Sequence, residues 1–165
     1  MQIVRMFRHL LLPHWWVLRA FPKSMLLAIE RAIGSSEKRH QGELRFVVEA
    51  NLPLSRLLRG QSPRARAIEL FSKLRVWDTE HNSGVLIYLQ LIDRRVEIVA
   101  DRGIDARVGP AFWSAVCRRM ELAFRKERFE AGSLAALAEI TEALLEHDPS
   151  TGGGTNELPD APIVL

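Results

Sequence analysis

Cysteine is almost absent from this 165-residue chain, and long hydrophobic runs are missing. The single cysteine, Cys117, excludes an internal disulfide framework and a zinc site built from several cysteines. The longest nearly apolar run, residues 85–92, is less than half of a membrane-spanning helix, which needs about 20 apolar residues. The first 21 residues also lack a signal-peptide cleavage pattern. We therefore expect a cytoplasmic protein with neither a signal peptide nor a transmembrane helix.

Motifs of several large enzyme classes are missing as well. No G-x-S-x-G elbow presents a serine nucleophile, which argues against an α/β-hydrolase. The chain has neither G-x-G-x-x-G nor a phosphate loop with lysine, which argues against nucleotide binding. Cys117 lies between Trp113 and Met120 on the apolar face of a predicted helix, where burial makes a thiol unreactive. We predict that Cys117 packs in the core and is no nucleophile.

The charged residues are divided unevenly along the chain. Hydrophobic residues make up 47% and charged residues 26%, with a net charge of +3, which suits one globular domain. Residues 1–80 carry fourteen basic and seven acidic side chains, whereas residues 81–165 carry nine and thirteen. The basic half either forms an ordinary solvated surface or attracts anionic lipid or nucleic acid. Aromatic residues do not alternate with the arginines, which argues against nucleic acid as the partner.

Hydrophobic periodicity predicts four helices and three strands. The helices run from Ser24 to between Gly34 and Arg39, from Pro63 to about Arg75, from Pro110 through Phe124, and from Leu134 through Leu145. The strands lie at residues 43–50, 85–92 and 96–101. Ser24 and Ser62 are the predicted N-caps, and Ile68, Phe71 and Leu74 are the predicted apolar stripe of the second helix.

The order of these elements determines the predicted fold. A helix connects the first two strands, which must therefore be parallel if adjacent, and a short turn makes the last two an antiparallel hairpin. The middle strand is apolar on both faces, so helices must cover both sides of the sheet. We predict a three-layer α/β/α sandwich with a small mixed sheet, in the order α-β-α-β-β-α-α.

Both ends of the chain differ from the middle. We expect a basic, aromatic arm at residues 1–21, the folded domain at residues 22–149, and a glycine- and proline-containing tail at residues 150–165. Trp15, Trp16 and Arg19 suit a peripheral contact with the inner face of a membrane, or else the arm packs on the domain. The tail is either disordered or docked at a sheet edge, with strand pairing limited to residues 163–165.

Acidic and amide side chains gather where the predicted strands begin and end. If Ile92 pairs with Val96 in the hairpin, the loop before residue 84 lies beside the segment after residue 101, and the first strand begins at the same edge. The candidate ligands at this edge are Asp78, Glu80, Asn82, Asp101 and Asp105, with His40, Glu43, His81 and Arg102 nearby. Such oxygen ligands suit Ca²⁺ or Mg²⁺. The alternative is that they are ordinary turn residues that bond to nearby backbone groups.

Two segments resemble a known family. NSGVLIY at residues 82–88 and VEIVADRGI at residues 96–104, placed between a helix–strand–helix start and two closing helices, resemble the TPM domain over residues 22–147. This is the domain of the thylakoid-lumen phosphatase-like and photosystem repair proteins, with many bacterial members. The resemblance implies an α/β/α sandwich, an acidic divalent-cation site and acid phosphatase activity in some members, and ties to membranes or to membrane-protein maintenance.

These observations lead to two functional hypotheses. The first is a binding module that acts through a protein partner near the cytoplasmic membrane. The alternative is a divalent-metal-dependent phosphatase, in which Asp78, Glu80, Asp101 and Asp105 hold the cation. In that reaction the cation would polarise the phosphate oxygens and a carboxylate would activate water.

Overall fold

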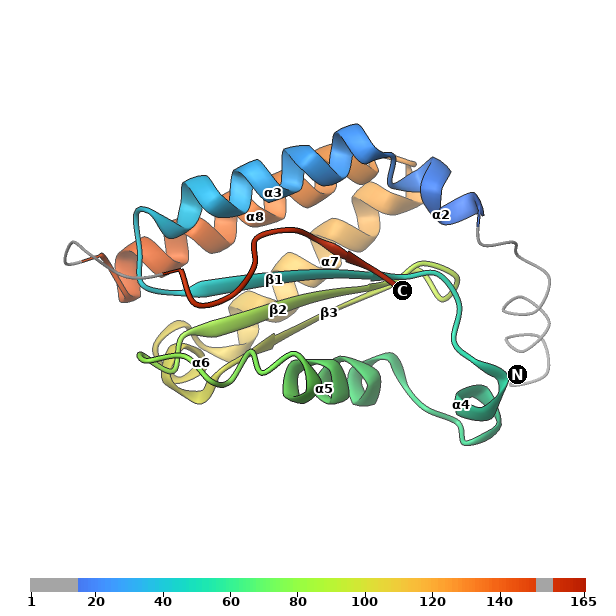
Figure 1. Ribbon diagram of the computed structural model, residues 1–165, viewed down its shortest axis with the longest axis horizontal. Coiled ribbons are helices and arrows are strands. Elements are labelled where there is room, and N and C mark those ends of the chain that lie inside the picture. The colour runs from blue at the N-terminus through green and yellow to red at the C-terminus, as the bar shows by residue number, and fades with distance from the viewer. Residues whose placement is uncertain (1–14, 151–155) are drawn as a thin grey trace.

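The computed structural model describes residues 15–150 and 156–165 and shows helices on both faces of a mixed sheet (Figure 1). The strands are β1 (Glu43–Glu49), β2 (Gly84–Gln90), β3 (Arg95–Ala100) and β4 (Ile163–Val164), in the spatial order β3-β2-β1-β4. β1 is parallel to both β2 and β4, and β2 is antiparallel to β3. The predicted parallel pair and the predicted hairpin are both confirmed.

The helices form two unequal layers around this sheet. They are α2 (Trp15–Ala20), α3 (Lys23–Glu37), α4 (Leu54–Leu58), α5 (Pro63–Lys73), α6 (Arg102–Val108), α7 (Pro110–Arg125) and α8 (Phe129–His147). In Figure 1, α3, α7 and α8 lie on one side of the sheet and α5 lies on the other. The predicted α/β/α sandwich is therefore confirmed. None of the helices within residues 15–150 and 156–165 is both long and apolar enough to cross a membrane.

β2 is one of the two central strands, and its residues are buried from end to end. Val85, Ile87 and Leu89 belong to the large core beneath α3, α7 and α8. Leu86 and Tyr88 belong to the smaller core beneath α5. This alternation explains why the strand is apolar on both faces, since each face packs against a helical layer.

The start of α5 agrees with its predicted cap, and its buried face agrees in part with the predicted stripe, because Phe71 and Leu74 pack against the smaller core. Ser62 Oγ accepts a hydrogen bond from the Ala65 amide at 3.1 Å, and Pro63 occupies the first turn. The helix buries Ala67 and Leu70, whereas Ile68 is exposed. The buried face of α5 is rotated relative to the predicted stripe, because it also includes Arg66. This side chain pairs with a carboxylate of β1.

Two other local predictions are wrong. α3 begins at Lys23 after Pro22, whose carbonyl accepts the amides of Met25 and Leu26, so Ser24 lies inside the first turn and is not the N-cap. In the hairpin, Leu89 rather than Ile92 is the partner of Val96. A turn over residues 91–94 takes up the difference, because the Arg94 amide bonds to the Leu91 carbonyl at 3.1 Å.

α6 was not predicted, because the sequence of this segment is typical of a loop. Asp101 caps it, because Oδ1 accepts the Arg102 amide at 2.7 Å. Gly109, at φ +88°, ends α6, and α7 begins at Pro110 as predicted. The helix has only seven residues, which is too short for a clear hydrophobic period.

The C-terminal segment adds a strand to the predicted three-stranded sheet. Val47 and Val48 of β1 pair with Ile163 and Val164. The Leu165 amide also bonds to the Val48 carbonyl at 2.9 Å. Docking at a sheet edge of the same chain is thereby confirmed for residues 156–165, whereas residues 151–155 lie outside the described part.

The described end of the N-terminal arm packs on the domain. Val17 is 1% exposed and Phe21 is fully buried in the large core, where its ring lies 6.5 Å from that of Phe46. Arg19, on the other side of α2, is exposed. The side chains of Trp15 and Trp16 and all of residues 1–14 lie outside what the structure describes, so their membrane contact stays a prediction.

Candidate functional sites at the two ends of the sheet

Asp101, the most buried of the predicted cation ligands, is 8% exposed and holds the start of α6. Its Oδ1 accepts the Arg102 amide, and its Oδ2 has no hydrogen-bond partner in the described part of the chain. Asp105 lies one turn later on α6, and its amide bonds to the Asp101 carbonyl at 2.9 Å. The first function of Asp101 is thus that of a helix cap.

The other predicted ligands lie in the loop before β2. Asp78 forms an exposed ion pair with Arg75 at 2.7 Å. Glu80 is exposed, with Oε2 at 4.0 Å from His81 Nε2. Asn82 has a left-handed backbone, at φ +51°, and its carbonyl accepts the Ile104 amide at 3.2 Å. Asn82 therefore ties this loop to α6 through its backbone.

The five candidate ligands do not meet in one cluster. Asp105 lines a cavity beside β3, whereas Glu80 lines a different cavity beside α3. Within residues 15–150 and 156–165, no three His, Cys, Asp or Glu side chains lie close enough to one another to hold a metal ion. Asp101 and Asp78 have structural partners instead. The Ca²⁺ or Mg²⁺ site stays a prediction.

The cavity that Glu80 lines, the acidic pocket, has a volume of about 630 Å³. Its charged lining residues are the acidic Glu30, Glu37, Glu43, Glu80, Glu157 and Asp160 and the basic Arg31 and Lys38. Burial raises the pKa of Glu37 to about 9, so this carboxyl is protonated at neutral pH. Glu43 accepts the amides of Glu157 and Leu158 at 3.2 and 3.0 Å. The C-terminal segment thus forms one wall of the acidic pocket.

His40 also lines the acidic pocket, but its contacts are structural. It is 3% exposed, and burial lowers its pKa to about 4, which keeps the imidazole neutral. His40 Nε2 lies 2.6 Å from Ser36 Oγ, which in turn lies 2.6 Å from Thr141 Oγ1. This chain of hydrogen bonds joins the end of α3 to α8.

A second cavity, the arginine pocket, lies at the opposite end of β2 and has a volume of about 410 Å³. It is lined by Arg19, Arg94, Arg95, Arg125 and Glu127, by the apolar residues Ala20, Leu89, Leu91, Phe124 and Phe129, and by Gln90. These residues come from the end of α2, the β2–β3 turn and the α7–α8 turn, which lie together at the right of Figure 1. Arginines therefore surround an apolar floor.

Most guanidinium groups of the arginine pocket are available to a ligand. Arg95 lies 3.7 Å from Glu121, whereas Arg19, Arg94 and Arg125 are exposed and form no ion pair with any described residue. This site could not be predicted from the sequence, because its residues come from three distant segments. The one signal was the clustering of arginines at chain reversals, at residues 94–95 and 125–128.

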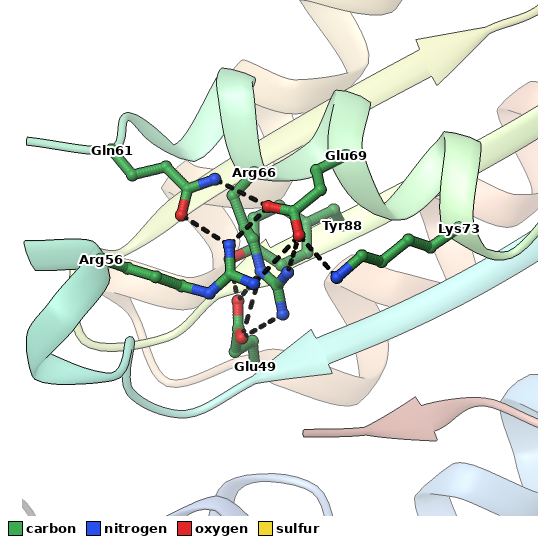
Figure 2. Close-up of polar contacts among 7 residues, drawn as sticks. All are labelled: Glu49, Arg56, Gln61, Arg66, Glu69, Lys73 and Tyr88. Carbon is green, nitrogen blue, oxygen red and sulfur yellow. Dashed lines mark hydrogen bonds and ion pairs between the residues drawn. The ribbon is translucent and has the colours of Figure 1, made fainter. Parts of the chain in front are cut away.

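The face of the sheet under α5 carries an ionic network whose inner part is buried (Figure 2). In the buried part, Arg66 and the Tyr88 hydroxyl both donate to the Glu49 carboxylate. Arg66 also forms an ion pair with Glu69 at 3.3 Å. Glu69 in turn accepts hydrogen bonds from Arg56 and Gln61 and forms an ion pair with Lys73 at 2.8 Å. Ion pairs and hydrogen bonds with Arg56 and Lys73 lower the pKa of Glu69. The network attaches α4 and α5 to the sheet.

The lone thiol lies against β3. Cys117 is half-buried, and burial raises its pKa to about 11. Trp113, one turn earlier on α7, is buried in the large core. The prediction that Cys117 packs in the core is confirmed in part, because the residue packs against the large core but also lines the cavity beside β3. Its lack of reactivity stays a prediction.

Comparison with known proteins agrees with this fold. The family model of the TPM domain matches residues 20–143 of this chain. The chain belongs to the TPM domain family. Among solved structures, this TPM domain is similar to the BA42 protein of the psychrophilic bacterium Bizionia argentinensis, with 27% identity and a TM-score of 0.75 over 86% of this chain and 93% of that one. The resemblance seen in the sequence is therefore confirmed.

A more distant neighbour shows the fold alone. The N-terminal domain of a protein from P. gingivalis is 19% identical, with a TM-score of 0.61 over 76% of this chain and 78% of that one. A search of curated proteins found no match.

Proposed function

We propose that this TPM domain is a binding module that attaches to an anionic membrane surface through the end that carries the arginine pocket. The observation behind the proposal is that Arg19, Arg94 and Arg125 are exposed at one end of the domain and have no acidic partner among the described residues. Arginines without partners attract lipid phosphates over a distance of about one Debye length.

The distribution of charge supports one orientation. β1 and β2 are parallel, and the acidic pocket lies where they begin, whereas the arginine pocket lies where β2 ends. Seven residues of strand put about 20 Å between these ends. An anionic surface attracts one end and repels the other, so the acidic pocket and the C-terminal segment face away from the membrane.

Co-sedimentation with vesicles tests the proposal. Vesicles of phosphatidylcholine alone are compared with vesicles that also contain phosphatidylglycerol, at low and at physiological salt. We expect binding only to the anionic vesicles, and weaker binding as the salt concentration rises.

Matched variants identify the surface. Each basic residue contributes about 1 kcal/mol near an anionic membrane, so Arg19→Gln, Arg94→Gln and Arg125→Gln together weaken binding by about a hundredfold. The control triple Arg59→Gln, Arg102→Gln and Arg118→Gln removes the same charge from exposed sites outside the arginine pocket. Equal losses in both triples would show that net charge alone drives binding.

The alternative function, a divalent-metal-dependent phosphatase, has one supporting observation. Glu37, a carboxyl that burial keeps protonated, shares the acidic pocket with Glu43 and Glu80. Carboxyls with raised pKa values in a cavity are typical of general acids.

Phosphatase assays with Mg²⁺, Ca²⁺ and Mn²⁺ test this alternative. Asp101→Asn is a clean variant, because asparagine caps a helix as well as aspartate does and so preserves α6. Metal-dependent turnover that is lost in this variant or in Glu37→Gln would support the enzyme and contradict a purely binding role.

A further inference from the structure

We propose that the arginine pocket binds one molecule of an anionic phospholipid, with the phosphate on the arginines and part of an acyl chain on the apolar floor. This inference rests on the proposed membrane attachment and adds the ligand. Attachment by surface charge alone needs no cavity, whereas a lipid-binding site needs both a cationic rim and an apolar interior.

The size and lining of the pocket fit such a ligand. Its volume of about 410 Å³ falls within the range of small-molecule sites, about 300–1,000 Å³. Phe124 and Phe129 form much of the floor, with ring centroids 5.3 Å apart. The ring of Phe21 lies 5.8 Å from that of Phe129, so the floor belongs to the packed core.

The charges around the rim favour an anion. Arg19, Arg94 and Arg125 form no ion pair within the described residues, and Glu127 is the one acidic side chain that lines the pocket there. A guanidinium group binds phosphate oxygens through two parallel N–H groups, which makes arginine well suited to a phosphate. The proposed site draws its guanidinium groups from three separate segments of the chain.

Gln90 supports the wall of the pocket from the other face of the sheet. Its position in β2 places its side chain on the same face as Leu86 and Tyr88, away from the floor of the pocket. Its Oε1 accepts the Asp93 amide at 2.9 Å. This hydrogen bond holds the β2–β3 turn that carries Arg94.

The walls of the pocket are held in place before any ligand arrives. In the β2–β3 turn, the Arg94 amide bonds to the Leu91 carbonyl, and Arg94 has a left-handed backbone at φ +53°. In the α7–α8 turn, the Glu127 amide bonds to the Phe124 carbonyl at 3.0 Å, at φ +57°. Fixed turns reduce the ordering entropy that binding costs.

The test uses short-chain lipids that dissolve as monomers. Titration calorimetry compares dihexanoyl phosphatidic acid with dihexanoyl phosphatidylcholine, which has the same chains without net charge, and with inorganic phosphate, which has no chain. We expect the phosphatidic acid to bind at least tenfold more tightly than either. Equal binding of inorganic phosphate would overturn the role of the apolar floor, and equal binding of phosphatidylcholine would overturn the role of the arginines.

Two variants locate the site. Ala20→Leu fills the interior without changing charge, and Arg125→Gln removes one guanidinium from the rim; each should weaken phosphatidic acid binding by about tenfold. Arg102→Gln, on α6 outside the pocket, is the control and should leave binding unchanged. Thermal melting checks the fold of each variant. If Ala20→Leu unfolds, the result for Arg125→Gln decides the test, because Arg125 is exposed and its substitution leaves the core intact.

The two proposals fail in different ways. Binding to anionic vesicles without binding of monomeric phosphatidic acid would overturn the lipid pocket and leave surface attachment intact. Binding of the monomer without binding to vesicles would contradict membrane attachment and retain the pocket.

Discussion

Arg66 donates hydrogen bonds to both carboxylate oxygens of Glu49, through Nε at 3.0 Å and through Nη2 at 2.7 Å. The two residues are 7% and 2% exposed, so this ion pair is almost fully removed from water. Its geometry matters because a buried charge without its partner costs far more than the pair contributes.

Glu49→Gln should destabilise the protein by about 3 kcal/mol, because it removes the buried carboxylate of Arg66 and leaves only the less buried Glu69, at 3.3 Å, as its ion-pair partner. Tyr88→Phe, which removes one hydroxyl from the same carboxylate, should cost about 1 kcal/mol. Urea denaturation measures both. If Glu49→Leu combined with Arg66→Met were less stable than Glu49→Gln alone, the ion pair would itself be a source of stability and the account would be wrong.

The stability of the protein should fall as the pH rises from about 4.5 to about 9, because burial raises the pKa of Glu37 from 4.5 to about 9. In this range the folded state binds a proton that the unfolded state has released, so stability falls with rising pH by up to about 1.4 kcal/mol per pH unit.

Glu37→Gln should flatten this slope and stabilise the protein at pH 8, since glutamine needs no proton and keeps the acceptor for the Leu44 amide. Glu43, whose pKa is also raised by burial, should leave a smaller slope in the same direction. Denaturation midpoints at several pH values provide the measurement. An unchanged slope in Glu37→Gln would show that Glu37 is ionised in the folded protein.

Removal of the C-terminal segment should destabilise the domain. A chain that ends at Ser150 loses β4, exposes the Val47 and Val48 edge of β1, and leaves the Glu43 carboxylate without two amide donors. It also leaves Arg45, which donates to the Pro159 carbonyl, without its acceptor. We expect a loss of about 2–3 kcal/mol and a melting temperature lower by about 5–10 °C. A melting temperature equal to that of the full chain would mean that β4 contributes nothing to folding.

A divalent cation that binds at the sheet edge with the predicted ligands, Asp78, Glu80, Asn82, Asp101 and Asp105, would raise the melting temperature, since ligand binding stabilises the folded state. At millimolar Ca²⁺ or Mg²⁺ we expect a small shift that EDTA reverses and that Asp101→Asn abolishes. Absence of any shift with the fold intact would remove this edge from consideration as a cation site.

Signals confined to one segment made most of the fold predictable. The run of apolar residues in β2 indicated burial on both faces, and Ser62 followed by Pro63 indicated the start of α5. The spacing of Trp113, Met120 and their neighbours indicated the buried face of α7. Each of these signals reflects local geometry, which the sequence records directly.

Much of what escaped prediction depends on contacts between distant segments. One exception is local: Asp101 caps α6, a helix too short to show a hydrophobic period. The raised pKa of Glu37 depends on burial, and Asp160, at the far end of the chain, raises it further. The arginine pocket joins Arg19, Arg94 and Arg125 from three segments, and no spacing in the sequence connects them.

Membrane attachment requires the basic end of this TPM domain to contact the anionic surface. The most direct measurement is a ¹H–¹⁵N NMR titration with anionic bicelles, with zwitterionic bicelles as the control. We predict that amide signals of Arg19, Arg94 and Arg125 and their neighbours shift or broaden with the anionic bicelles alone, while those of Asp101 and Gly103 do not change. Signal changes centred on α6 and the loop before β2, or equal changes with both lipids, would contradict the account.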